Sequence, residues 1–136
     1  MSLRIATLLV LAVVLTGCGS RAPLKPDYTP KPDPELYQSI QRLPGVQTVK
    51  VRYFDTADKP QVYVGEIRVD PGTDLTHVLD QAMAILRQGR FRALLDLSVF
   101  SKTQSPVSSD SLVGNTRAGL DKRYGPQPGD GTPHAD

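Results

Sequence analysis

The sequence predicts a small α+β protein, a two-layer sandwich in which two helices cover one face of a three-stranded sheet. Three observations predict this class. Two stretches with helical spacing of apolar residues are interleaved with three stretches in which every second residue is apolar. Proline, glycine and aspartate mark the boundaries between them. The 136 residues suffice for one domain, which we place at residues 34–100, in the order helix, strand, strand, helix, strand.

Composition excludes several functional classes. The chain is 39% hydrophobic and 22% charged with a net charge of +2, which is not the basic footprint of a nucleic-acid-binding protein. A single cysteine excludes an intramolecular disulfide and a multi-cysteine metal site, and two histidines make a histidine-based site unexpected. We therefore expect no nucleic-acid partner, no metal and no cofactor other than a covalent lipid.

The first seventeen residues differ from the rest of the chain. Arg4 is their only charge, and an apolar run interrupted only by Thr7 follows it over residues 5–15. As a helix this run would rise about 16 Å, which is far short of the roughly 30 Å hydrocarbon core of a bilayer. The pattern is therefore typical of a secretory signal and not of a membrane span.

The apolar run ends at Leu15-Thr16-Gly17-Cys18, and this motif resembles the lipobox of bacterial lipoproteins. The resemblance implies that residues 1–17 are a cleaved signal peptide and that Cys18 carries a diacylglyceryl group and an acyl chain such as palmitate. It also implies a lipid-anchored protein on the extracytoplasmic face of the plasma membrane or outer membrane. Acyl chains contribute ~0.8 kcal/mol per buried CH₂, which suffices for stable anchoring. The alternative is a buried cysteine at the end of a hydrophobic helix.

Residues 18–33 are predicted to be the lipidated cysteine and a tether. Five prolines fall between Pro23 and Pro34, and such a stretch favours an extended polyproline II conformation of about 3.1 Å per residue. The tether would hold the domain up to roughly 40 Å from the bilayer. A ligand for a proline-recognising module is the alternative. Loss of Arg4 with the signal leaves the mature chain near neutrality, so no basic patch toward anionic lipid is evident.

The first helix is predicted over residues 34–43. Asp33 is a suitable N-cap, Pro34 is suited to the first helical position, and Pro44-Gly45 ends the helix. A hairpin follows, because residues 46–54 and 61–69 alternate apolar with polar side chains around a polar loop.

The second helix is predicted over residues 74–88, with Thr73 or Asp74 as its N-cap and an apolar stripe along one side. Gly89 is suited to a left-handed stop at the end of this helix. A third alternating strand is predicted over residues 91–100.

Residues 101–136 are predicted to be a mostly disordered tail, because serine, glycine, proline and aspartate dominate them. Two local features stand out within this tail. Leu112-Val113 could form a short strand, and residues 118–124 a frayed helical turn.

The step Leu43-Pro44-Gly45-Val46, followed by an alternating strand, a hairpin and an amphipathic helix, resembles the middle of a ferredoxin-like domain of the heavy-metal-associated type. The Cys-x-x-Cys of that family is absent, which excludes its metal chemistry here. Its first strand is also absent. We therefore expect the strands around Ile67 and Leu95 to pair directly in parallel. Insertion of residues 111–115, or of a partner's strand, between them is the alternative.

The sheet face away from the helices is the predicted interface, since the alternation places an apolar strip among charged residues on it. The strip consists of Phe54, Val62, Val64, Leu94 and Phe100. The simpler interpretation is that these side chains are scattered, or that the C-terminal tail covers them.

His77 is the one candidate for catalysis, because Asp74 and Asp80 flank it at helical spacing. No nucleophile motif accompanies it: the serines near the tail lie in neither a Gly-x-Ser-x-Gly nor a Ser-x-x-Lys sequence. We expect no catalytic residue and a solvated histidine. The sequence thus favours a non-enzymatic envelope lipoprotein that acts as an interaction or assembly module for a protein partner or a second copy. A lipoprotein that binds a small molecule or an envelope polymer is the alternative.

Overall fold

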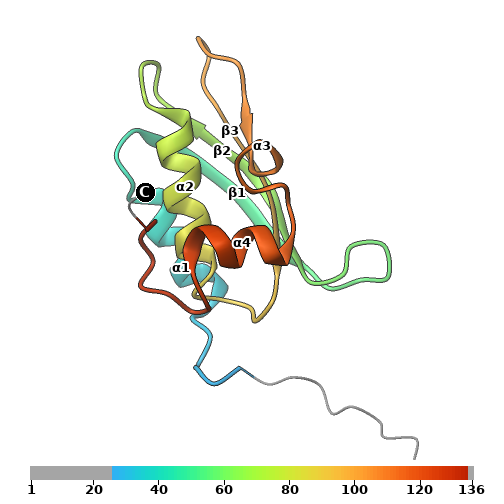
Figure 1. Cartoon of the computed structure of the whole chain (residues 1–136). Coiled ribbons are helices and arrows are strands. Elements are labelled where there is room, and N and C mark those ends of the chain that lie inside the picture. Colours follow the sequence, from blue (N-terminus) through green and yellow to red (C-terminus); the bar gives the residue numbers. More distant parts are fainter. Residues whose placement is uncertain (1–25, 135–136) are drawn as a thin grey trace, which may run out of the picture.

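The computed structural model describes residues 26–134, and in these the predicted elements are present in the predicted order (Figure 1). Two further helices and a two-residue strand follow them. The elements are α1 (Asp33–Gln41), β1 (Val46–Phe54), β2 (Val62–Val69), α2 (Leu75–Leu86), β3 (Leu94–Phe100), β4 (Val107–Ser108), α3 (Ser109–Val113) and α4 (Arg117–Tyr124).

The sheet has the strand order β1-β2-β3-β4. β1 and β2 form an antiparallel hairpin that places Tyr53 beside Tyr63, and β2 pairs in parallel with β3, which places Tyr63 beside Leu95. The direct pairing of the second and third strands is thus confirmed, with α2 as the connection between them. Insertion of residues 111–115 between these strands is wrong, because they follow β4 at the far edge of β3.

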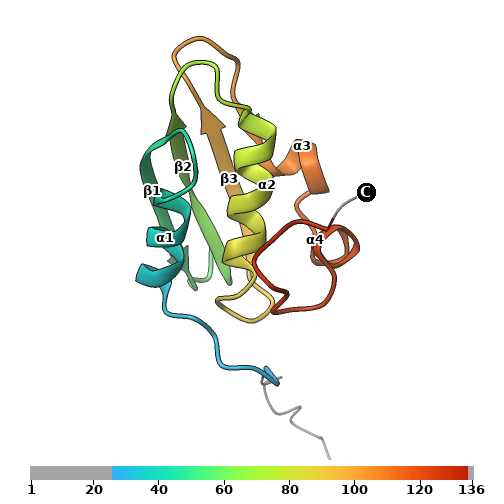
Figure 2. The same cartoon turned by 90° about the vertical axis from the view of Figure 1, so that its left-hand side faces the viewer.

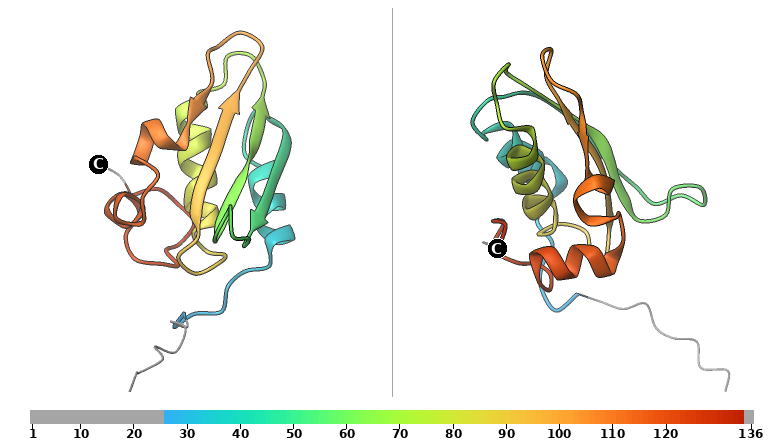
Figure 3. Two further views of the ribbon diagram at one scale, coloured as in Figure 1. Left: turned by 90° about the vertical axis from the view of Figure 1, so that its right-hand side faces the viewer. Right: turned by 45° about the horizontal axis from the view of Figure 1, so that its top comes forward.

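α1 and α2 lie side by side on one face of the sheet, whereas no helix of the described residues covers the other face (Figures 1 and 3). The chain is therefore a mixed α/β protein with the predicted two layers, consistent with a small ferredoxin-like fold. The covered face carries side chains of which at most 5% is exposed: Val51, Tyr63, Ile67, Val69, Leu95, Leu97 and Val99.

The start of α1 differs from the prediction, because its N-cap is Pro32 and not Asp33. The Asp33 carboxylate instead accepts hydrogen bonds from the Tyr63 hydroxyl (2.8 Å) and from the Arg90 guanidinium (2.9 Å). The Tyr63 hydroxyl in turn accepts the Arg90 backbone N–H (3.1 Å). Partners distant in the sequence thus take the carboxylate that the local pattern assigned to a cap, and they tie α1 to the sheet and to the loop after α2.

The prediction that Gly89 ends α2 in a left-handed conformation is wrong. The helix ends at Leu86 with Arg87 as a right-handed C-cap, and Gly89 is not among the residues of positive φ. A Cβ at Gly89 would instead lie 2.5 Å from both Leu36 Cδ1 and the Tyr63 hydroxyl oxygen. This position requires glycine because α1 and the sheet approach the backbone too closely for a side chain.

β3 begins at Leu94 and not at Phe91. Arg92 has a φ of 60°, in the left-handed region, and a residue of that conformation cannot continue a strand. Phe91 and Arg92 form a turn instead.

The C-terminal segment is ordered, which corrects the prediction of a mostly disordered tail. The helical turn predicted over residues 118–124 is present as α4, and its Leu120 and Tyr124 are buried in the core. Leu112-Val113, predicted as a strand, belongs to α3. Figure 2 shows both helices beside α2, beyond the β3 edge. The composition of this segment did not indicate its order, because two buried side chains and two ion pairs suffice to hold a polar segment against the core.

The prediction for Cys18 and for the signal peptide over residues 1–17 falls outside the described residues. The described end of the tether packs on the domain: the Tyr28 hydroxyl donates to the Gly89 carbonyl (2.9 Å), and the Lys31 N–H donates to the Gln88 carbonyl (3.0 Å). Among residues 26–134 there is no helix with the length and apolar character needed to cross a bilayer.

Candidate functional site

The predicted interface residues lie together on the uncovered face of the sheet, which we call the open face. The strand register aligns Phe54 with Val62 and Val62 with Leu94, so these three form one row across β1, β2 and β3. Val64 is in the next row, and Phe100 lies toward the other end of β3. All five side chains are half-buried, in contrast to the alternate residues that face the helices.

Two cations lie over the two aromatic rings of the open face. The Lys59 ammonium lies 5.0 Å from the centroid of the Phe54 ring, and the Arg68 guanidinium lies 5.0 Å from that of Phe100. Exposed cations in this arrangement contribute about 0.5–1 kcal/mol each. The two rings therefore hold the Lys59 and Arg68 charges close to the apolar surface, while both cations stay exposed to solvent.

A hollow of about 640 Å³ runs along β1 on the open face. On the open face its lining consists of Lys50, Arg52, Phe54, Lys59 and Val64, and the neighbouring β1 residues Val49 and Val51, whose side chains point to the covered face, complete it. β1 is also the edge strand of the sheet. An occupant of this hollow would thus meet apolar side chains, positive charges and the β1 edge, with which no strand of residues 26–134 other than β2 pairs.

The described C-terminal segment does not cover the open face. α4 is held on the side of α2 by an ion pair between Arg123 and Asp80 (2.8 Å) and by a hydrogen bond from the Tyr124 hydroxyl to Asp80 (2.6 Å). Burial acts to raise the pKa of the Asp80 carboxyl, but these hydrogen bonds outweigh it and lower the pKa below its ordinary value. The interpretation that residues 101–134 shield the strip is therefore wrong.

The arrangement considered for His77 catalysis is not formed. The Asp74 carboxylate accepts the His77 backbone N–H (3.0 Å) and so caps α2, as predicted. The Asp80 carboxylate is engaged by Arg123 and Tyr124. Both acids that could have oriented the imidazole thus have structural roles.

Ser109 is the buried member of the serine group near the tail, and its role is structural as well. Its hydroxyl donates to the Leu95 carbonyl (2.8 Å) and accepts the Leu97 N–H (3.1 Å). Ser109 therefore occupies the edge of β3 in place of a pairing strand, with both hydrogen-bonding functions of its hydroxyl used.

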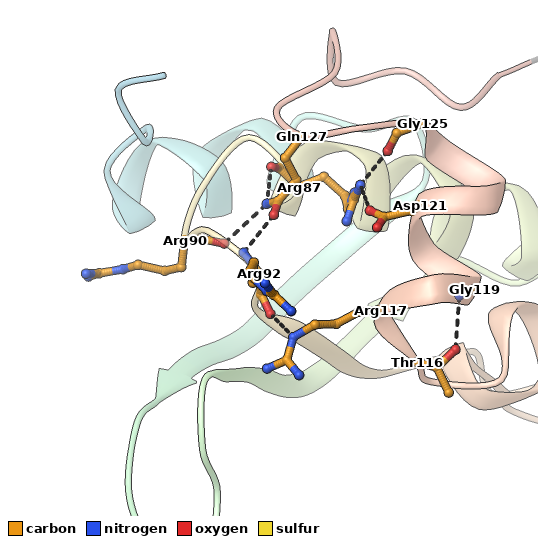
Figure 4. A network of polar contacts seen from close by, with 9 residues as sticks. All are labelled: Arg87, Arg90, Arg92, Thr116, Arg117, Gly119, Asp121, Gly125 and Gln127. Atoms are coloured by element: carbon orange, nitrogen blue, oxygen red, sulfur yellow. Dashed lines mark hydrogen bonds and ion pairs between the residues drawn. The ribbon is translucent and has the colours of Figure 1, made fainter. Parts of the chain in front are cut away.

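A second site, which the sequence patterns did not predict, lies at the end of the molecule where α2 leads into β3. Arg87, Arg92 and Arg117 come together there around a cavity of about 330 Å³, while Arg90 points away from them (Figure 4). We call this cavity the arginine pocket. Its lining is completed by Phe91, Ala93, Asp121, Pro126 and Gln127. No local motif could reveal it, because its residues come from three segments that only the docking of α4 brings together.

In comparisons with known proteins, the sequence matches no protein-family model and no curated protein. The roles of the open face and of the arginine pocket are therefore inferred from the geometry and chemistry of this chain.

Proposed function

We propose that this chain is a lipid-anchored protein of the bacterial envelope that binds a protein partner through its open face and catalyses no reaction. The observation that carries the proposal is the difference between the two faces of the sheet. Every helix of the described residues lies on one face or beside its edge, and the other face presents an apolar row that none of them covers. An apolar strip that no other element covers and that has a charged rim is typical of a protein interaction site.

Cys18 is the proposed site of the lipid anchor, because Leu15-Thr16-Gly17-Cys18 resembles a lipobox. Tyr28 and Lys31 are held against the loop after α2, so the free part of the tether is shorter than the proline pattern alone indicated. Residues 18–28 reach at most about 35 Å when fully extended. The domain would then lie close to the membrane, within reach of the membrane-proximal parts of a larger assembly.

The charges of the open face favour a different protein over a second copy as the partner. Around the apolar row lie four cations and two acids: Lys50, Arg52, Lys59, Arg68, Glu66 and Asp96. Two copies would bring like charges together, which opposes association. A partner with an apolar centre and an acidic rim complements this face.

The proposal that the chain catalyses no reaction is supported by the hydrogen bonds that the candidate catalytic residues already make. The carboxylates nearest His77 in the sequence cap a helix and hold α4, and the buried serine hydroxyl is fully hydrogen-bonded. None of these groups is presented to a cavity as an activated nucleophile or base would be.

Photo-crosslinking of the full lipidated chain in its native membrane tests the partner proposal. A photoreactive amino acid replaces Val64 on the open face or, as the matched control, Thr76, which is exposed on α2. We expect one discrete protein adduct from position 64 and none from position 76. Combining the position-64 probe with Arg52→Glu should reduce that adduct at least several-fold, because the variant repels an acidic partner.

Three results would overturn the proposal. Equal adducts from both positions would mean that the open face is not selective. An adduct only with a second copy of the chain would replace the heteromeric partner by a homodimer. The absence of any protein adduct from position 64 would leave a small molecule or an envelope polymer as the ligand.

A further inference from the structure

The arginine pocket carries more positive charge than its surroundings neutralise. Arg87, Arg92 and Arg117 contribute three guanidinium groups to its lining, and Asp121 contributes the one carboxylate. The Arg87 side chain is only 5% exposed, whereas the Asp121 side chain that pairs with it at 2.8 Å is 62% exposed. One largely solvated carboxylate thus compensates a buried cation and leaves two further cations beside it.

The donors of the two remaining arginines are available to a ligand. Arg117 Nε donates to the Arg92 carbonyl (2.8 Å), which fixes the Arg117 side chain at the pocket while its terminal nitrogens make only one long contact, 3.5 Å to Gln61. Within residues 26–134, the Arg92 guanidinium donates no recorded hydrogen bond. A guanidinium group whose terminal nitrogens are free presents paired N–H donors that match the oxygens of an oxyanion, and the Arg117 group is in addition fixed in position.

The loop that carries the pocket is held in place before any ligand binds. The Gln127 side chain donates to the carbonyls of Arg87 (2.9 Å) and Arg90 (3.3 Å), and it accepts the Arg92 N–H (2.7 Å) (Figure 4). These bonds hold Arg92 in its left-handed conformation, which is unfavourable for a residue with a side chain. Strained backbone held by surrounding contacts is a recurrent feature of binding sites.

We propose that the arginine pocket binds a phosphate monoester group. Three arginines and one aspartate leave two positive charges, which match the charge of about −1.5 to −2 that a phosphate monoester carries near pH 7. The cavity of about 330 Å³ is larger than a phosphate group alone. Its apolar lining, from Phe91, Ala93 and Pro126, accommodates the group that the phosphate esterifies.

The position of the pocket favours a lipid headgroup as the source of the phosphate. The Tyr28 ring packs edge-on against Phe91, with centroids 6.3 Å apart, so the segment that leads toward Cys18 touches a wall of the pocket. With the anchor proposed at Cys18, ten residues separate this contact from the bilayer. The lipid source rests on that proposed anchor, whereas binding of free phosphate does not.

Calorimetric titration of the full mature chain in zwitterionic detergent with inorganic phosphate tests the pocket itself. We expect saturable binding that Arg92→Gln weakens at least tenfold. Because the Arg92 guanidinium makes no recorded bond within the described residues, this change should leave the melting temperature unaltered. Arg42→Gln, which removes the same charge from an exposed position at the end of α1, is the matched control and should bind phosphate like the unaltered chain.

A second arm distinguishes the two sources. Flotation of the same variants with phosphatidylcholine vesicles, with and without phosphatidic acid, should show retention that depends on phosphatidic acid and is lost with Arg92→Gln. Binding of inorganic phosphate without a response to phosphatidic acid would retain the pocket and overturn the lipid source. No phosphate binding, or equal weakening by Arg92→Gln and Arg42→Gln, would overturn the site. None of these outcomes depends on a protein partner at the open face.

Discussion

The covered and open faces of the sheet differ in what their side chains contact, although alternate residues of the same three strands build both. On β2, Tyr63 and Ile67 are completely buried beneath the helices, whereas Val62 and Val64 are half-buried on the other side. The charges differ in the same way. Asp80 and Arg123 fasten elements on the covered side, while Lys59 lies over an aromatic ring on the open side. One face thus carries most of the buried core, and the other is the face for which we propose a partner.

The largest expected effect separates these two roles directly. Leu97→Ala deletes a completely buried side chain of β3 and should lower the free energy of unfolding by about 2–5 kcal/mol. The matched truncation on the open face, Val64→Ala, should cost less than about 1 kcal/mol. Urea unfolding followed by circular dichroism measures both variants. Equal losses would show that the open face contributes to the core.

An intermediate effect is expected at the C-terminal segment, which extends the covered side. Leu120→Ala should lower the free energy of unfolding by about 2 kcal/mol, because Leu120 is buried in the core but belongs to a short helix that can partly relax. Lys122→Ala, at an exposed position of the same helix, should change it by less than about 0.5 kcal/mol. A neutral Leu120→Ala would mean that the segment contributes nothing to the fold in solution.

The smallest effect is expected at the polar contact that docks α4. Asp80→Asn should lower the free energy of unfolding by about 1 kcal/mol at neutral pH, because it weakens the bonds from Arg123 and Tyr124. Asp110→Asn, at an exposed position, is the control for loss of a charge.

The effect of Asp80 should also depend on pH in a defined direction. Because the folded chain lowers the Asp80 pKa below its ordinary value of 3.8, the contribution is complete above that value and is lost as the pH falls through the folded pKa. The difference in unfolding free energy between the unaltered chain and Asp80→Asn should therefore shrink between pH 7 and pH 3. A difference that grows on acidification would contradict the assigned contacts.

The helices and strands with a strong periodicity of apolar residues were predictable, because this periodicity indicates which side of each element is buried. The alternation in residues 46–54 and 62–69 and the stripe of α2 each require an apolar surface on one side, and the only two-layer arrangement of these pieces puts both helices on one face. The placement of Phe54, Val62, Val64, Leu94 and Phe100 on one face of the sheet followed from the same alternation. The direct parallel pairing of β2 and β3 was favoured because a proline-rich stretch, which is unsuited to a strand, precedes the first helix in the sequence.

The predictions failed where a residue's role depends on partners distant in the sequence. Asp33 has the residue type of a cap but binds Tyr63 and Arg90, and Gly89 has the type of a helix stop but makes room for neighbouring side chains. The prediction of a disordered tail failed for the same reason. Only Leu120 and Tyr124 of α4 are buried in the core, and two such residues leave no apolar pattern in the sequence.

By itself the sequence determined the two-layer α+β class, the chain order of the first five elements and the residues that alternate onto the open face, because periodicity is a local property of the chain. It also carries the lipobox pattern on which the anchor is proposed. The tertiary structure decided between the two possible pairings of the third strand and added β4. Only the tertiary structure decided that the open face stays uncovered and that Arg87, Arg92 and Arg117 surround one cavity. The reason is physical: the docking of α4 on α2 depends on shape and on charge pairing between segments more than twenty residues apart, which no local pattern encodes.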